Sequence, residues 1–191
     1  YGAEDFAGMM PELSQIANIK TEKVMTIMSE DMAPEDWKMI AKRVAKELND
    51  EEVSGVIVTH GTDTLHFSTA ALSFFLHDLN KPVVFTGEQR SIDRGGSYAF
   101  MNLICSLHAS AKFDGAAVAA CMHGTTNDDF CLLNRGTKIR KMHTSRRDAF
   151  RPINENPLAK VFKNGQIDIL NKNYSKRRDG KVFVDGKFEN M

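Results

Sequence analysis

Thr62 and Asp63 lie side by side in the segment 59–64, which reads Thr-His-Gly-Thr-Asp-Thr. A threonine hydroxyl is a poor nucleophile until a base removes its proton. A carboxylate can hold a lysine or a substrate ammonium group, and a lysine can serve as the base when its pKa is lowered. We therefore expect Thr62 and Asp63 to form a catalytic group if Lys141 or Lys138 folds back beside them.

The position of this segment favours a functional site. The β-branched run at 55–59 reads as a fully buried strand, and residues 65–79 repeat apolar side chains at helical spacing. In an open parallel sheet, ligands bind at the carboxyl ends of the strands, where such a polar segment would lie. The simpler alternative is that Thr62 and Asp63 only cap the helix that begins near Thr64, because capping alone favours these residue types.

Two further segments carry polar residues after predicted strands. Ser29 and Glu30 follow a weakly alternating run at 24–28, where they would either bind the polar ends of a small ligand or form a loop that leads into a helix. The connection 88–97 is long and polar for a link between a strand and a helix, and such loops are often functional. It contains neither the GxGxxG pattern of dinucleotide-binding proteins nor a phosphate-binding P-loop.

The alternation of strands and helices predicts the architecture. Up to residue 120, we expect strand 24–28, helix 34–49, strand 55–59, helix 65–79, strand 82–85, helix 99–111 and strand 116–120. Short links between such elements predict right-handed strand–helix–strand units, and hence an α/β fold with a parallel sheet. Further along the chain, we expect short strands at 158–162, 167–170 and 182–184, a hairpin turn at Asn164–Gly165 and a basic linker at 172–181.

Composition limits the class of protein. The 191 residues are 42% hydrophobic and 26% charged, which suits one domain with a substantial core. The 25 basic and 25 acidic residues balance, so no overall field attracts nucleic acid or acidic membranes. The 3 cysteines form no CxxC pair and the 6 histidines show no ligand spacing, so we expect no metal site and a reducing, cytoplasmic location. No run approaches the roughly 18 apolar residues of a membrane span.

Several runs resemble a known family. Residues 55–64 resemble the second active-site signature of the L-asparaginase/amidohydrolase family, and residues 82–87 resemble the strand that follows it. Within that family, the runs at 89–94, 101–103 and above all 140–150 resemble the D subunits of archaeal glutamyl-tRNA(Gln) amidotransferases (GatD). The resemblance covers nearly the whole chain. It implies a three-layer α/β sandwich whose sheet is doubly wound and mostly parallel, with the site at the carboxyl ends of the strands.

The resemblance also implies roles for individual residues. Thr62 would be the second catalytic threonine, Asp63 would bind the amino group of the substrate, and Lys141 would be the lysine of the triad. Ser29 and Glu30 would contact the carboxylate and amino ends of the ligand. The implied reaction is hydrolysis of the side-chain amide of glutamine or asparagine through an acyl-enzyme.

In the amidotransferases that the chain resembles, the released ammonia passes to a partner protein, GatE. GatE uses ATP and magnesium to activate Glu-tRNA(Gln) and then amidates it. The resemblance therefore implies that this chain has no cofactor of its own, that it meets tRNA only through the complex and that it forms a homo-oligomer. The absence of a long apolar run separately leads us to expect no membrane partner. The basic run at 140–147 is then either a surface for a partner or solvated surface.

The chain departs from the family pattern in several places. The first catalytic threonine of the family lies in an N-terminal GGTIA-type strand, a sequence that these 191 residues do not contain. The chain begins at Tyr1 rather than Met, and Tyr98 stands near the place of a family aspartate. We expect residues 1–155 to be the N-terminal α/β domain without its first strand, and residues 156–191 to lead through short strands and a basic linker toward a C-terminal domain.

These departures leave alternatives for the function. The chain alone is expected to be inactive, as a fragment, a natural truncation or a degenerate paralogue of an amidotransferase subunit. A second interpretation is a free cytosolic L-asparaginase. A third, from a different class, is a non-catalytic module that binds a small ligand or a partner with the same fold.

Overall fold

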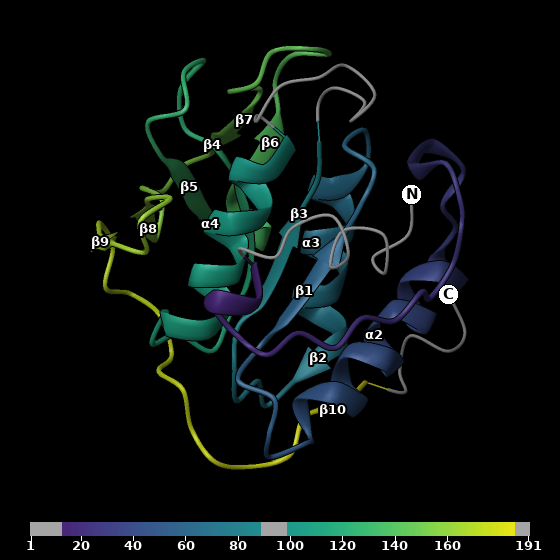
Figure 1. The fold of residues 1–191 in the computed structure, drawn as a ribbon. Coiled ribbons are helices and arrows are strands. Elements are labelled where there is room, and N and C mark those ends of the chain that lie inside the picture. Colours follow the sequence, from purple (N-terminus) through teal and green to yellow (C-terminus); the bar gives the residue numbers. More distant parts are fainter. Residues whose placement is uncertain (1–12, 89–98, 186–191) are drawn as a thin grey trace.

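The computed structural model describes residues 13–88 and 99–185, which form a central sheet with helices on both faces (Figure 1). The sheet has six strands in the order β1-β3-β4-β5-β8-β9. Strands β1, β3 and β4 are parallel, whereas β5, β8 and β9 continue the sheet in antiparallel pairs. Their bounds are Val56–Thr59 (β1), Val83–Thr86 (β3), Val118–His123 (β4), Cys131–Arg135 (β5), Ala159–Val161 (β8) and Ile167–Ile169 (β9).

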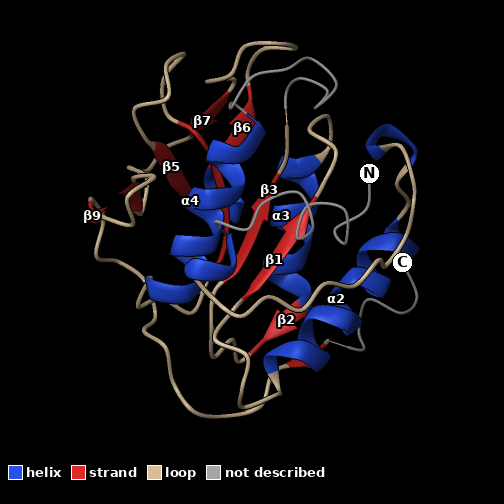
Figure 2. Cartoon of the chain, viewed as in Figure 1, coloured by secondary structure: helices blue, strands red, loops and turns tan. Residues whose placement is uncertain are grey.

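Helices, short turns and two small sheets complete the described part of the chain (Figure 2). The helices are α2 (Pro34–Leu48), α3 (Leu65–Phe75) and α4 (Ala99–Lys112). The 3-10 turns are η1 (Leu13–Gln15), η2 (Ser29–Asp31) and η3 (Gly136–Lys138). The small antiparallel sheets pair β2 (Leu76–His77) with β10 (Phe183–Val184), and β6 (Ile139–Lys141) with β7 (Phe150–Pro152).

Alternating side chains of the parallel strands form two separate cores. On β3, Val83 and Phe85 pack into the cluster that contains α2 and α3, while Val84 between them packs with α4. Figure 1 shows α4 on the near side of the sheet and α3 behind it. The predicted α/β class and its three-layer, doubly wound arrangement are therefore confirmed, with a mixed sheet whose central strands are parallel.

Helix α2 forms where the sequence predicts it. Pro34 occupies the first turn, where its missing N–H costs nothing, and the carboxylate of Asp36 accepts a hydrogen bond of 2.8 Å from the backbone N–H of Ala33. The buried side chains recur at helical spacing and form one apolar face. They are Ile40, Ala41, Val44, Ala45 and Leu48.

Two predictions about strands near the site are wrong. Residues 24–28 form no strand, because no described strand pairs with them, and Val24 and Ile27 remain 37% and 40% exposed. Strand β1 is half-buried rather than fully buried. It lies at the edge of the described sheet and has a hydrogen-bonded neighbour, β3, on one side only.

Other boundaries also differ from the prediction. Helix α3 ends at Phe75 instead of continuing to residue 79, because Leu76 and His77 turn into a strand that pairs with β10. Strand β5 lies in no predicted element, since its polar residues interrupt the apolar pattern. The predicted hairpin turn at Asn164–Gly165 is confirmed: it joins β8 to β9, and Gly165 has the positive φ of 88° that favours glycine.

The predicted linker at 172–181 forms no helix or strand, but it is fastened to the body of the fold. Figure 1 shows it passing across the end of the sheet away from β6 and β7. The guanidinium of Arg177 donates to three backbone carbonyls, those of Phe113, Ser110 and Ser54. Ser110 lies in the last turn of helix α4, and Phe113 directly follows this helix. A cation at this end also interacts favourably with the helix dipole.

We expect Arg177→Ala to lower the free energy of unfolding by about 2 kcal/mol, because it removes charge-assisted hydrogen bonds to carbonyls that would otherwise lack a donor. The neighbouring Lys176→Ala is the matched control. The side chain of Lys176 is 77% exposed, and its one described ion pair is with the carboxylate of Asp114. Lys176→Ala should therefore cause no measurable change in the free energy of unfolding. Urea titration of both variants measures the difference, and equal stabilities would contradict the role of Arg177.

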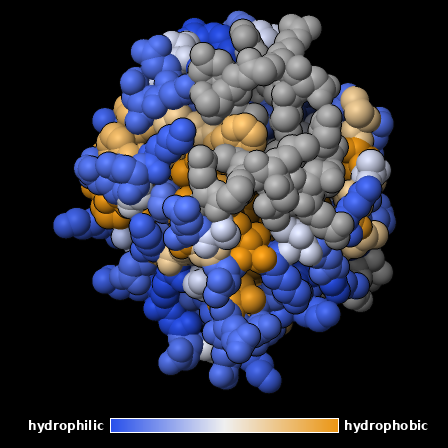
Figure 3. All heavy atoms as spheres, viewed as in Figure 1, coloured by the Kyte–Doolittle hydropathy of each residue, from blue (hydrophilic) through white to orange (hydrophobic). Residues whose placement is uncertain are grey.

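On the face that Figure 3 shows, the described surface is mainly hydrophilic, and small groups of apolar residues are exposed between the polar ones. Within residues 13–88 and 99–185, no helix is both long and apolar enough to cross a membrane.

Candidate active site

Lys141 brings the predicted catalytic residues together. Its ammonium nitrogen Nζ donates one hydrogen bond of 2.9 Å to Thr62 Oγ1 and another of 2.8 Å to Asp63 Oδ1. These partners lie 79 and 78 positions away in the sequence, so the fold must create the contact. The Lys141 side chain is 8% exposed, whereas that of Asp63 is 62% exposed. A ligand can therefore reach the carboxylate while the lysine stays shielded.

The hairpin of β6 and β7 determines which lysine reaches Thr62. Side chains alternate along a strand, so Ile139 and Lys141 of β6 face the core, and Arg140 between them faces solvent. Lys138 lies before the strand, in η3, and none of its described contacts involves Thr62. The structure thus pairs Thr62 with Lys141, whereas the residue pattern left the choice between two lysines open.

The structure does not support the interpretation of Thr62 and Asp63 as helix caps. The N-cap residue of α3 is Thr64, and no side chain makes a capping hydrogen bond there. The hydroxyl of Thr64 instead donates a bond of 2.7 Å to the backbone carbonyl of Ser29. This bond fastens the loop after β1 to the turn η2.

Ser29 consequently lies against this loop, residues 60–64, which is the predicted catalytic loop. A Cβ atom on Gly61 would approach Ser29 Cβ at 2.7 Å and Ser29 Oγ at 2.8 Å, so this close packing requires a glycine. Ser29 is 5% exposed, and its hydroxyl lies 3.5 Å from Glu30 Oε2. Glu30 is exposed on the same turn. The structure therefore brings Ser29 to the loop, and the roles of Ser29 and Glu30 in binding a ligand stay predictions.

A hydrogen-bond network connects the catalytic loop to helices α2 and α3. The indole N–H of Trp37 donates a bond of 2.8 Å to Ser68 Oγ, and the Ser68 hydroxyl lies 2.8 Å from His60 Nε2. His60 Nδ1 lies 2.7 Å from the carbonyl of Gly61 and must donate to it, which leaves Nε2 to accept from Ser68. Burial lowers the pKa of His60, which favours the neutral ring that this arrangement requires.

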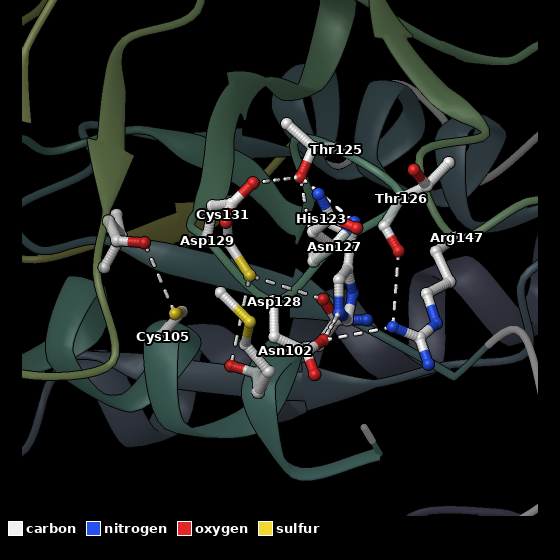
Figure 4. Close-up of polar contacts among 12 residues, drawn as sticks. Asn102, Cys105, His123, Thr125, Thr126, Asn127, Asp128, Asp129, Cys131 and Arg147 are labelled. Carbon is white, nitrogen blue, oxygen red and sulfur yellow. Dashed lines mark hydrogen bonds and ion pairs between the residues drawn. The ribbon is translucent and has the colours of Figure 1, made fainter. Parts of the chain in front are cut away.

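Gly87, which directly follows β3, packs against Thr62. A Cβ atom on Gly87 would meet the carbonyl oxygen of His60 at 2.3 Å and Thr62 Cγ2 at 3.3 Å. The amide of Asn102 donates a bond of 2.8 Å to the carbonyl of Gly87. Cys131 Sγ in turn donates to Asn102 Oδ1 at 3.4 Å (Figure 4). Burial raises the pKa of Cys131, so the thiol keeps the proton that it donates. The sequence pattern did not identify this support.

A second polar cluster joins the loop after β4 to the β6–β7 hairpin. His123 Nε2 and Arg147 Nη1 both donate to Asp128 Oδ1, at 3.1 and 3.2 Å, and Arg147 also donates to the carbonyl of Thr126 at 3.3 Å (Figure 4). His123 is 3% exposed, and burial lowers its pKa although Asp128 opposes the shift. The sequence alone did not predict this cluster, because Arg147 lies 19 positions from Asp128. The adjacent Asp128 and Asp129, in a turn after a predicted strand, were its only local signal.

Glu88 follows Gly87 and is half-buried. Burial raises the pKa of its carboxyl to about 9, against the opposing charge of Arg147. The Glu88 side chain therefore carries a proton at neutral pH.

We expect Glu88→Gln to flatten the dependence of stability on pH. Between about pH 5 and pH 9, the folded protein holds a proton on Glu88 that the unfolded chain releases, so the free energy of unfolding falls as the pH rises through this window. Glutamine has no such proton and should be more stable at pH 7 by about 1–2 kcal/mol, a value discounted for partial exposure. Urea titrations at several pH values measure it, and parallel curves for both proteins would contradict the assignment.

Some predicted features cannot be placed. Residues 89–97 of the polar connection, and Tyr98, lie outside the described residues. Within the described ranges, no group of three or more His, Cys, Asp or Glu side chains is arranged to hold a metal ion, and the three cysteines are buried free thiols. That the chain uses no metal and no cofactor stays a prediction.

A groove of about 750 Å³ runs along the open edge of β1. Residues 17–27 form one wall, and parts of α2 and α4 form others. Ser29, His60 and Gly61 also line the groove, so it reaches the catalytic loop.

Comparison with known proteins agrees with this geometry. The profile of the family described as "Asparaginase, N-terminal" matches residues 1–175. The D subunit of the glutamyl-tRNA(Gln) amidotransferase (GatD) of Pyrococcus horikoshii is 54% identical over 189 residues, which are 99% of this chain and 43% of that protein. The GatD of Archaeoglobus fulgidus is 52% identical over 161 residues, which are 84% of this chain and 38% of that protein.

A solved structure, the thermostable L-asparaginase from Thermococcus kodakarensis, superposes with a TM-score of 0.80 at 26% identity. The match covers 96% of this chain and 52% of the asparaginase. The chain thus spans less than half the length of the two GatD proteins and about half that of the asparaginase. A family profile that matches most of the residues, a shared fold and a lysine bound to the threonine of the signature lead to one conclusion: the chain belongs to the asparaginase family.

Proposed function

We propose that this chain is the asparaginase-like part of GatD, the amide-hydrolysing protein of a glutamyl-tRNA(Gln) amidotransferase. It would release ammonia from glutamine or asparagine for the conversion of Glu-tRNA(Gln) to Gln-tRNA(Gln). The observation that carries the proposal is the contact of Lys141 Nζ with Thr62 Oγ1 and Asp63 Oδ1. The names and high identities of the archaeal relatives support the assignment to GatD over other members of the family.

The geometry suits proton transfer from a threonine. In its neutral form, Lys141 would accept the proton of the Thr62 hydroxyl, which lies within hydrogen-bond reach. Asp63 would stabilise the ammonium that results. Because the Asp63 carboxylate is largely exposed, it would also hold the amino group of the substrate, while Ser29 and Glu30 contact its polar ends. The substrate amide would acylate a threonine oxygen, ammonia would leave with the proton that Lys141 had accepted, and water would then hydrolyse the ester to release the acid.

The groove beside β1 offers a place for the strand that carries the first catalytic threonine of the family. An edge strand has backbone groups that a further strand can pair with, and the groove along β1 reaches Gly61. We propose that it accepts the GGTIA-type strand of the family, which would place the first catalytic threonine beside Thr62. Residues 1–191 do not contain that sequence.

The partners follow from the same proposal. GatE would take the ammonia and supply the site for ATP and magnesium, tRNA would be bound through the complex, and GatD itself would be a homo-oligomer in the cytoplasm. A free L-asparaginase is the second candidate, favoured by the likeness to the Thermococcus enzyme. A non-catalytic module of the same fold is the third.

A reconstituted reaction separates the three candidates. The full-length protein is mixed with purified GatE, Glu-tRNA(Gln), ATP, magnesium and either glutamine or asparagine, and Gln-tRNA(Gln) is measured. The proposal predicts Gln-tRNA(Gln) only when both proteins are present. Rapid hydrolysis of asparagine that is unaffected by GatE, without Gln-tRNA(Gln), would identify a free asparaginase. Ligand binding without any turnover would identify the non-catalytic module.

A further inference from the structure

The β6–β7 hairpin has two faces with different chemistry. Its inward side chains include Ile139 and Phe150, which are buried, and Lys141, which contacts Thr62. On the opposite face, Arg140 lies directly across from Arg151 in the strand register. One face of this small sheet thus holds the catalytic lysine, and the other presents cations.

The pairing of two arginines is unfavourable within the isolated chain. Residues directly opposite in antiparallel strands have Cβ atoms about 4.5–5.5 Å apart, and like charges at these positions destabilise a sheet. Asp148 offsets part of the charge, because Arg146 and Arg151 both form ion pairs with its buried carboxylate. Arg140 is exposed and forms no ion pair within the described part of the chain. Three guanidinium groups against one carboxylate leave an excess of two positive charges among these four residues.

An exposed apolar residue continues the same surface. Met142 follows Arg140 by two positions and is 60% exposed. Arginine and methionine are enriched in the interfaces between proteins, whereas lysine is depleted there. A nucleic-acid surface would need a longer basic stripe, and the net charge of this chain is zero.

We propose that the outer face of the β6–β7 hairpin, formed by Arg140, Arg151 and Met142, docks an acidic surface of another protein. Resting on the proposed function, we take that protein to be GatE. The docked partner would supply carboxylates that balance the two excess charges. Because Lys141 lies on the same three-residue strand as Arg140, docking would also hold the lysine in place beside Thr62.

The structure indicates which residues can test this proposal. Arg146 and Arg147 belong to the same basic run, but their guanidinium groups bind Asp148 and Asp128 within the chain. Reversing those charges would disturb the hairpin itself, so the loss of a partner could not be told from misfolding. Arg140 forms no such ion pair with the described residues, and Arg140→Ala should leave the melting temperature unchanged or raise it slightly.

The experiment measures the affinity of the full-length protein for purified GatE by calorimetry. Three proteins are compared: the wild type, Arg140→Glu, and Lys42→Glu, which makes the same charge change on the exposed face of α2. We expect Arg140→Glu to weaken binding about 30-fold at low salt, because the new carboxylate would repel the acidic surface of GatE. The effect should be smaller at high salt, which screens this repulsion. Lys42→Glu should stay within about twofold of the wild type.

A photo-crosslinker at position 140 in the same complex identifies what lies opposite. Crosslinks to an acidic segment of GatE would support the proposal, whereas crosslinks to tRNA or to a second copy of this chain would overturn it. Equal affinities of Arg140→Glu and the wild type would overturn the docking surface and leave the proposed function intact. Failure of the wild-type protein to bind GatE would overturn both.

Discussion

Replacing Lys141 with methionine is expected to lower kcat for amide hydrolysis by the full-length protein by about 10²–10⁴-fold. Methionine has a similar length but cannot accept the proton of Thr62 or form the ion pair with Asp63. Binding of the substrate should weaken much less, because Lys141 is shielded and Asp63 faces solvent. Steady-state kinetics with glutamine and asparagine, together with ligand binding by calorimetry, measure both effects.

Lys138→Met is the matched control for this experiment. Lys138 lies three positions earlier, in η3, but its described contacts do not include Thr62. Its replacement should change kcat by less than about threefold. A Lys138 variant as inactive as the Lys141 variant would show that the functional lysine was wrongly assigned.

Gly87→Ala should produce the second large effect, on both stability and activity. The added Cβ would lie 2.3 Å from the carbonyl oxygen of His60 and 3.3 Å from Thr62 Cγ2, so the backbone of the catalytic loop must move. We expect a loss of about 2–3 kcal/mol in the free energy of unfolding. We also expect a fall in kcat that exceeds the loss of folded protein, because the displaced atoms belong to the loop that holds Thr62.

Gly124→Ala provides the comparison for the Gly87 variant. Its added Cβ would meet the ring of Phe130 at 2.3 Å, which is just as close, but a half-buried side chain can rotate away where a backbone carbonyl cannot. Thermal unfolding measures the stability of both variants, and steady-state kinetics measure their kcat. If Gly87→Ala is no more damaging than Gly124→Ala, the close packing behind Thr62 is not rigid.

The contact between Thr62 and Lys141 separates what could be predicted from the sequence from what could not. Apolar periodicity predicts the strand before Thr62 and the helix after it, because both have regular apolar spacing. Spacing alone could not select Lys141 over Lys138, since the choice depends on which face of β6 meets the core. The resemblance to the family selects Lys141, and the structure places that lysine on Thr62.

Other features were not predictable because they depend on contacts between distant segments. Strand β5 has a polar second half and is recognised only by its pairing with β4 and β8. Residues 24–28 alternate like a strand but find no described partner. The cluster of His123, Asp128 and Arg147 joins two loops whose separation in the sequence gives no local pattern.

The measurement that tests the central claim most directly is the rescue of the Lys141→Met variant by ammonium chloride in the reconstituted amidotransferase reaction. If this chain supplies ammonia to GatE, the variant should form almost no Gln-tRNA(Gln) from glutamine or asparagine. With ammonium chloride as the nitrogen source, it should form Gln-tRNA(Gln) at the rate of the wild type. Undiminished synthesis from glutamine by the Lys141→Met variant would contradict the assigned site. A wild-type complex that uses ammonium chloride but neither amide would contradict the proposed function.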